Sequence, residues 1–196
     1  MDNTDCEIIL KEKKLDNTVI ENYEIDDAYY IFDYLPRYRN EGQFDENSEN
    51  IINVKKRDLQ AIEYFKNKII EILNQNQKFV ICVIPPSCIK TEISGISLIA
   101  KEICKTNSNW IDGTEVIKRI KNINQKHNKT KEYPKYLTEQ ESLEITDTEK
   151  IKNKCVLLLD DITTRGQAIK ITKTELKYAG VSKVISLTLG KTIYKF

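Results

Sequence analysis

The sequence predicts an α/β fold with an open, mostly parallel sheet flanked by helices. The first support is a set of short apolar runs of the kind that form strands buried on both faces. These runs are 78–84, 156–159 and 184–189. The second support is helical spacing of apolar residues in the neighbouring segments 58–73, 93–104 and 167–179. Alternating strands and helices are typical of βαβ units, whose strands run parallel.

The N-terminal quarter of the chain is harder to assign. Residues 7–10 and 28–34 have the composition of strands, and the second run is rich in aromatic residues. Residues 39–50 are polar and include a glycine and several asparagines, so they are predicted to form a loop.

Composition limits the classes of function. The chain has 196 residues, enough for one compact domain with a sizeable core. Its 31 basic and 30 acidic residues give no net basic charge of the kind that indicates nucleic-acid binding. No apolar stretch is long enough for a membrane helix, and residues 1–5 are too polar for a signal peptide. Because the five scattered cysteines form no CxxC pair, we expect a reduced, cytoplasmic protein without a zinc site.

The segment 156–168 carries the strongest functional signal. An apolar run ends in Asp160 and Asp161, and a turn rich in threonine and glycine then leads into a helix. Backbone N–H groups of such a turn and of the helix N-terminus can bind a phosphate, and the threonines can donate hydroxyl groups to it. The two carboxylates, at the carboxyl end of a strand, can accept hydrogen bonds from ribose hydroxyl groups. The alternative is an ordinary strand, turn and helix with an acidic turn.

The residues that follow this segment agree with a βαβ unit. The helix predicted over 167–179 is followed by Gly180, at a position where glycine commonly ends a helix. A buried strand over 184–189 comes next. Four residues of the helix are expected to face inward, namely Ile169, Ile171, Leu176 and Tyr178.

Segment 156–166 resembles the phosphoribosyl pyrophosphate (PRPP) signature of type I phosphoribosyltransferases, and 78–193 is most similar to their ComF (competence protein F) branch. The resemblance implies a type I phosphoribosyltransferase-like fold and transfer of the phosphoribosyl group from PRPP to a nitrogenous base. It implies that Asp160 and Asp161 hold the ribose hydroxyl groups at the reaction site. Mg²⁺ would be bound through PRPP and water, without direct protein ligands. The implied 5′-phosphate loop consists of Thr163, Thr164, Arg165, Gly166, Gln167 and Ala168.

The same resemblance implies that the loop after the strand at 78–84 binds pyrophosphate. A basic strand further along the chain adds two candidates, for which plain surface charge on an edge strand is the alternative. The pyrophosphate-binding candidates are Pro86, Ser87 and Lys90 in the loop and Lys118 and Arg119 in the basic strand. The polar segment 122–150 is predicted to be a mobile loop that closes over PRPP.

The resemblance also implies an organisation and a set of partners. Residues 1–54 would form a small N-terminal hood-like region, and residues 55–196 the phosphoribosyltransferase-like core of one compact domain. The acceptor base stays unidentified, because base specificity in this family comes from a hood largely outside the shared core, here residues 1–54 with parts of 107–150 as a further option. The expected partners are PRPP and a small-molecule acceptor, with a homodimer or a protein partner as a further option.

Three positions depart from the family pattern. Arg165 and Ala168 stand where hydroxyl residues are usual, and Ser94 stands where an arginine usually precedes the glycine that begins a helix. These departures support a second hypothesis, a non-catalytic sensor of PRPP or of a nucleotide that acts through a protein partner. Hydrolysis or phosphorolysis of a ribosylated compound at the same site is a third hypothesis.

Overall fold

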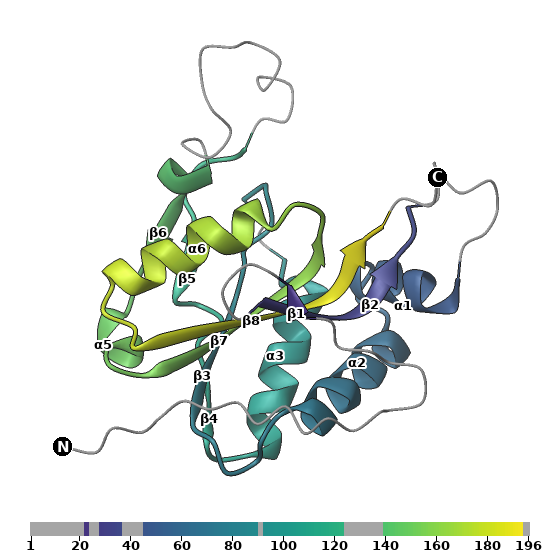
Figure 1. Cartoon of the computed structure of the whole chain (residues 1–196), viewed down its shortest axis with the longest axis horizontal. Helices are drawn as coiled ribbons and strands as arrows, with labels where there is room; N and C mark the ends of the chain where they lie inside the picture. The colour runs from purple at the N-terminus through teal and green to yellow at the C-terminus, as the bar shows by residue number, and fades with distance from the viewer. Residues whose placement is uncertain (1–21, 24–27, 37–44, 90–91, 124–138, 194–196) are drawn as a thin grey trace.

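A central sheet with helices on both faces forms the body of the molecule (Figure 1). The computed structural model describes residues 22–23, 28–36, 45–89, 92–123 and 139–193. In spatial order, the sheet strands of this part are β1 (Asn22–Tyr23), β2 (Ala28–Tyr34), β8 (Lys183–Thr192), β7 (Cys155–Thr163), β3 (Phe79–Val83) and β4 (Trp110–Asp112). All neighbours pair in parallel except β1, which is antiparallel to β2. The predicted α/β class with a mostly parallel, helix-flanked sheet is therefore confirmed.

Different elements cover the two faces of the sheet. One face carries the helices α1 (Glu46–Lys55), α2 (Leu59–Ile72) and α3 (Gly95–Thr106). The other carries α6 (Gln167–Tyr178), α5 (Thr148–Ile151) and the antiparallel pair β5 (Ile117–Arg119) and β6 (Leu143–Ile145). Alternate strand residues supply the two cores, because successive side chains of a strand point to opposite faces. Among the described helices, none has both the length and the apolar character that crossing a membrane requires.

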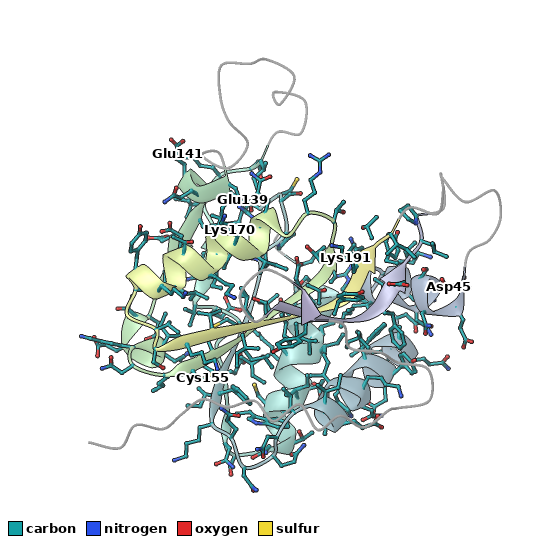
Figure 2. The ribbon with its side chains drawn as sticks, in the orientation of Figure 1. Asp45, Glu139, Glu141, Cys155, Lys170 and Lys191 are labelled. Carbon is teal, nitrogen blue, oxygen red and sulfur yellow. The ribbon has the colours of Figure 1, made fainter. Side chains whose placement is uncertain are left out.

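Three helices on one face begin at side-chain caps. Asp45 lies at the start of α1 (Figure 2), and its side chain accepts a hydrogen bond from the third residue further on, at 2.7 Å. Asp58 caps α2 in the same way at 2.9 Å, and Ser94 caps α3 at 3.2 Å. These caps satisfy N–H groups that a helix leaves without a partner in its first turn. They also fix the residue at which each helix begins on this face of the sheet.

Most of the predicted elements are confirmed. The strand predictions agree with β2, β3, β7 and β8, and the helix predictions agree with α2, α3 and α6. Gly180 has a φ of 89° and follows the last turn of α6, as predicted for a helix-ending glycine. Ile169 and Leu176 are buried as expected, but Tyr178 is 79% exposed, so its predicted inward position is wrong.

Two loop predictions are wrong where the structure describes them. Residues 46–50 belong to α1 and are not part of a loop, because a capped polar segment forms a helix once Ile51 and Val54 pack against the core. Residues 139–150 contain β6 and the start of α5 instead of a mobile loop. Residues 122 and 123 lie in neither a helix nor a strand, as predicted. Residues 39–44 and 124–138 of these two predictions lie outside the described residues, as does the strand predicted at 7–10.

The predicted boundary between the hood-like region and the core lies close to the end of α1. The boundary between residues 54 and 55 falls just before the last residue of α1. Val54 and the core helices share one buried cluster with β7, so α1 packs with the core in this structure. The assignment of residues 1–54 as a hood stays a prediction from the resemblance.

The order of the strands reverses between β3 and β7. From β3 the chain passes through α3 to β4 on one side, and from β7 it passes through α6 to β8 on the other. Because α3 and α6 lie on opposite faces of the sheet, a crevice forms at the carboxyl ends of β3 and β7. Open α/β sheets bind their ligands at such a point.

Candidate functional site

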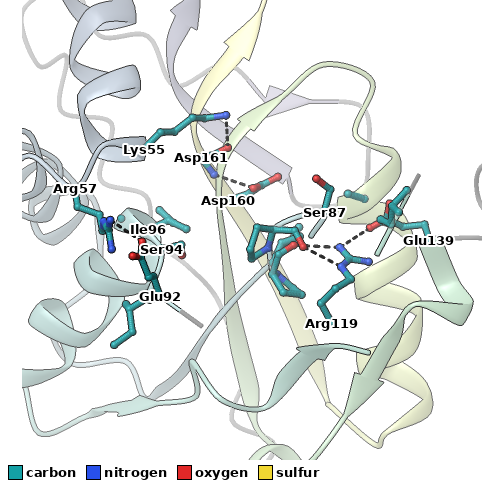
Figure 3. A pocket seen from close by; sticks show the side chains of 17 residues that line it. Lys55, Arg57, Ser87, Glu92, Ser94, Ile96, Arg119, Glu139, Asp160 and Asp161 are labelled. Atoms are coloured by element: carbon teal, nitrogen blue, oxygen red, sulfur yellow. Dashed lines mark hydrogen bonds and ion pairs between the residues drawn. The ribbon is translucent and has the colours of Figure 1, made fainter. Parts of the chain in front are cut away.

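A cavity of about 460 Å³ opens where the strand order reverses (Figure 3). It forms because β3 leaves the sheet earlier than β7 does. The N–H of Ile84 still donates to the carbonyl oxygen of Leu159 at 2.9 Å. Pro85 and Pro86 then follow, and neither has an N–H group that could extend the ladder. Since β7 continues to Thr163, its edge beyond Leu159 borders the cavity.

Asp160 and Asp161 lie on this stretch of β7 and line the cavity. The sequence predicted that the strand ends at the acidic pair. In the structure the strand continues through this pair to Thr163. The N–H of Asp161 donates to Oδ1 of Asp160 at 2.8 Å, and the N–H of Ile162 donates to Oδ1 of Asp161 at 2.6 Å. The last residue of α1, Lys55, places its Nζ 3.3 Å from Oδ1 of Asp161. These contacts fix both carboxyl groups before a ligand arrives.

Asp160 binds its proton more tightly than an ordinary aspartate does. Its pKa is raised well above the ordinary 3.8, first because burial desolvates the carboxyl group and second because the charge of Asp161 is close. The N–H of Asp161 and the charge of Lys55 oppose this rise. A protonated carboxyl group can donate a hydrogen bond as well as accept one.

Arg119 holds the loop after β3 in place. Its Nε donates to the carbonyl oxygen of Pro86 at 3.0 Å, and its Nη2 donates to that of Pro85 at 3.1 Å. Nη2 also pairs with Oε1 of Glu139 at 2.9 Å, and Nη1 donates to the hydroxyl of Ser142. The side chains of Arg119 and Glu139 are only 4% and 8% exposed. This guanidinium is therefore occupied within the protein, although it borders the cavity.

A second arginine stands at the other end of the cavity. Nη2 of Arg57 lies 2.7 Å from Oε2 of Glu92, and these side chains are 44% and 67% exposed. In Figure 3 the Arg57 pair and the Arg119 pair lie on opposite sides of Asp160. Counting Lys55, the lining has three basic side chains, each paired with a carboxylate, and four acidic ones in all.

Two helix N-termini also reach the cavity, because Gly95 begins α3 and Ala168 lies in the first turn of α6. Helix N-termini favour anions such as phosphate groups. Gly95 is required at its position, since an added Cβ would lie 1.9 Å from the carbonyl oxygen of Val54. This close approach of α3 to α1 brings Lys55 and Arg57 beside the N-terminus of α3.

The structure brings together only some of the residues that the sequence predicts for the site. Lys90 lies outside the described residues, and Lys118 is exposed and does not line the cavity. The predicted residues that line it are Pro86, Ser87, Arg119, Asp160, Asp161 and Ala168.

Three of the six residues of the predicted 5′-phosphate loop make hydrogen bonds within the protein. Oγ1 of Thr163 accepts a hydrogen bond from the N–H of Gly166 at 3.1 Å, and the hydroxyls of Thr164 and Thr192 lie 3.0 Å apart. Gly166 has a φ of 67°, which glycine adopts readily. Arg165 is exposed, and Gln167, like these residues, is not part of the cavity lining. Phosphate binding by this turn stays a prediction.

Sequence reasoning missed four charged residues of the cavity. Lys55 is the last residue of α1 and Arg57 comes two residues later, and the sequence analysis did not predict this helix. Glu92 and Glu139 are not part of any recognisable sequence motif. The available signal was Asp45, a residue type that commonly caps helices, followed by acidic residues Glu46 and Glu49 and the apolar pair Ile51 and Ile52.

No protein-family model matches this chain, and a search of curated proteins finds no match either. The similarity of 156–166 to phosphoribosyltransferases thus stays a resemblance of sequence. Function must be inferred from the cavity and the residues that line it.

Proposed function

We propose that this chain is a phosphoribosyltransferase that binds PRPP with Mg²⁺ in the cavity between β3 and β7. The observation that carries the proposal is the position of the adjacent Asp160 and Asp161 in one cavity with the loop 85–87 and two helix N-termini. Neighbouring carboxyl groups suit the vicinal hydroxyl groups of a ribose. Helix N-termini on either side, together with Lys55 and Arg57 at one end of the cavity, suit its phosphate groups.

Phosphoribosyl transfer exchanges one bond at C1 of the ribose. The bond from C1 to the pyrophosphate oxygen breaks, and pyrophosphate leaves with the electron pair. A nitrogen of the acceptor forms the new bond to C1 with its own lone pair and gives up a proton if it carries one. Asp160 and Asp161 would hold the ring, while the cationic and N–H groups would stabilise the charge on the leaving group. The reaction requires no nucleophilic side chain from the protein.

Mg²⁺ fits this site as part of the ligand complex. Within the described residues, no group of three or more His, Cys, Asp or Glu side chains could hold a metal ion. PRPP is strongly anionic, and each of the three basic side chains of the lining is already paired with a carboxylate, so the cavity alone would neutralise little of its charge. When bound, Mg²⁺ neutralises part of the pyrophosphate charge and retains waters. Asp160 and Asp161 could contact it through those waters.

The experiment that tests this proposal is calorimetric titration of the full chain with PRPP, with and without Mg²⁺. We expect binding that requires Mg²⁺ and is lost in the double variant Asp160→Asn/Asp161→Asn. Asp147→Asn is the matched control, because it makes the same change at a carboxyl group outside the cavity lining. Equal binding by the wild type and the double variant would contradict the proposal. A screen of nitrogenous bases for pyrophosphate release would then identify the acceptor.

A non-catalytic PRPP or nucleotide sensor is the alternative function. It is favoured by Arg165 and Ala168, which stand where hydroxyl residues are usual, and by the pairing of the Thr164 hydroxyl with that of Thr192 at 3.0 Å. Such a sensor would bind PRPP but release no pyrophosphate with any base. It would also change its affinity for a protein partner when PRPP is present.

The proposal includes a cytoplasmic, reduced protein. The cysteines that the structure describes, at positions 82, 88, 104 and 155, are free thiols. Burial raises the pKa of Cys82 and of Cys104 to about 12, so these thiols are protonated and unreactive. Free thiols of this kind support a reducing compartment.

A further inference from the structure

The backbone at Arg57 adopts a conformation that few arginines adopt. α1 ends at Lys55, Lys56 is its C-cap, and Arg57 follows with a φ of 64°. Its N–H donates to the carbonyl oxygen of Val54 at 2.9 Å, which closes the end of the helix. Glycine is the usual residue at this position, because a Cβ is unfavourable in the left-handed region. An arginine here is therefore retained at some cost to stability.

The side chain of Arg57 reaches the cavity and is only weakly held. It lines the cavity beside Ser94, and its partner Glu92 is 67% exposed. Exposed ion pairs contribute little to stability, so a ligand could replace Glu92 without a large loss. A guanidinium can bind two oxygens of a phosphate group at once.

We infer that Arg57 is an anion-binding residue of this cavity, retained in a left-handed backbone conformation because its guanidinium binds a phosphate or pyrophosphate group in place of Glu92. The identity of that anion as part of PRPP rests on the proposed function. Binding of the anion itself depends only on the position of Arg57 at the cavity.

Asn153 provides a comparison for the effect of backbone conformation alone. It also has a left-handed backbone, with a φ of 57°, and it lies two residues before the start of β7. The acidic pair lies towards the other end of that strand, and Asn153 is not part of the cavity lining. Glycine at either position removes the unfavourable Cβ, but only one of the two changes removes a cation from the cavity.

The test compares Arg57→Gly, Arg57→Lys and Asn153→Gly with the wild type in the full chain. Thermal melting measures stability, and calorimetric titrations with inorganic pyrophosphate and with PRPP, both with Mg²⁺, measure binding. We expect Arg57→Gly to bind pyrophosphate at least about tenfold more weakly. Its melting temperature should be unchanged or higher by about 2 °C. Arg57→Lys should bind with intermediate affinity, and Asn153→Gly should bind as the wild type does.

The outcomes separate this inference from the proposed function. Unchanged pyrophosphate affinity in Arg57→Gly would overturn the inference, while Mg²⁺-dependent PRPP binding that needs Asp160 and Asp161 would leave the proposed function intact. Loss of pyrophosphate binding in Arg57→Gly supports the inference. If the wild type then binds PRPP no more tightly than pyrophosphate, the proposed function fails and the inference stands. A wild type that binds neither anion would overturn both.

Discussion

Arg57 and Arg119 are the same residue type at opposite ends of one cavity, yet the structure uses them differently. The side chain of Arg119 is 4% exposed, and its guanidinium donates to two loop carbonyls, to a hydroxyl and to the carboxylate of Glu139. The side chain of Arg57 is 44% exposed and has an ion-pair partner that is itself exposed. Burial and existing partners thus decide which arginine is available to a ligand. The position of an arginine in the sequence, beside a predicted binding motif, does not show whether it is available.

The difference implies opposite effects of substitution at the two ends. Loss of Arg119 would disturb the loop 85–87 and leave the carboxylate of Glu139 buried without its partner. Loss of Arg57 would remove a cation from the cavity and relieve an unfavourable backbone. Substitution of Arg119 should therefore mainly lower stability, whereas substitution of Arg57 should mainly weaken ligand binding.

The largest effect is expected from Arg119→Met, which should reduce the free energy of unfolding by about 3 to 5 kcal/mol, because it breaks a buried ion pair. Urea denaturation measures this loss. The double variant Arg119→Met/Glu139→Leu should recover most of it, since no buried charge is left without a partner. A loss below about 1 kcal/mol in the single variant would show that the pair is not structural.

A smaller loss is expected from Gly95→Ala at the Arg57 end. The added Cβ would lie 1.9 Å from the carbonyl oxygen of Val54, so α3 must move away from α1. Overpacking of this kind typically costs about 1 to 3 kcal/mol. We also expect weaker PRPP binding, because the shift displaces the N-terminus of α3 from Arg57. Urea denaturation measures the stability of this variant, and calorimetry on the same preparation measures its PRPP affinity. If the variant is as stable as the wild type, α1 and α3 can separate at little cost, which would contradict this prediction.

Asp160→Asn should change how stability depends on pH. The pKa of Asp160 is raised in the folded protein, so the folded state holds this proton up to higher pH than the unfolded chain does. Stability therefore falls as the pH rises from the ordinary value of 3.8 towards the raised pKa. The variant lacks this group and should lose less stability over that range in urea denaturation. Parallel curves for the variant and the wild type would contradict the raised pKa.

The smallest effect is expected from Lys118→Ala, one residue from Arg119. The side chain of Lys118 is exposed and lies outside the cavity lining. Its loss should change the free energy of unfolding by no more than about 0.5 kcal/mol and should leave PRPP affinity unchanged. A clear loss of affinity in calorimetry would restore the sequence prediction that Lys118 binds pyrophosphate.

Buried strands and helices could be predicted from the sequence because their apolar patterns are strong. β3 and the first part of β7 are continuous apolar runs, β8 carries apolar residues over much of 184–189, and α2 and α3 repeat apolar residues at helical spacing. α1 was missed because its buried face is small: Ser48, Ile51 and Val54. The extension of β7 through Asp160 to Thr163 was missed because acidic residues are uncommon in strands. In the structure, parallel pairing with β8 extends the strand through these residues.

The candidate site could be predicted only in part. Asp160, Asp161 and Ser87 come at or soon after the ends of apolar runs in the sequence, so local pattern was enough to place them near one another. Arg57 reaches the cavity through a turn between two helices, and no local pattern indicates such a contact. Arg119 was placed correctly near the cavity, but its burial and its four hydrogen bonds depend on tertiary structure.

The most direct test of the account is to map the PRPP contact surface on the isotope-labelled chain by NMR, adding PRPP and Mg²⁺ stepwise. We predict that the largest backbone amide shifts occur at Asp160, Asp161, Ser94 and Ala168, around the cavity between β3 and β7. Such a result would place the ligand at the point where the strand order reverses. Shifts confined to residues outside this cavity, or no shifts at saturating PRPP, would contradict the claim that it is the PRPP site.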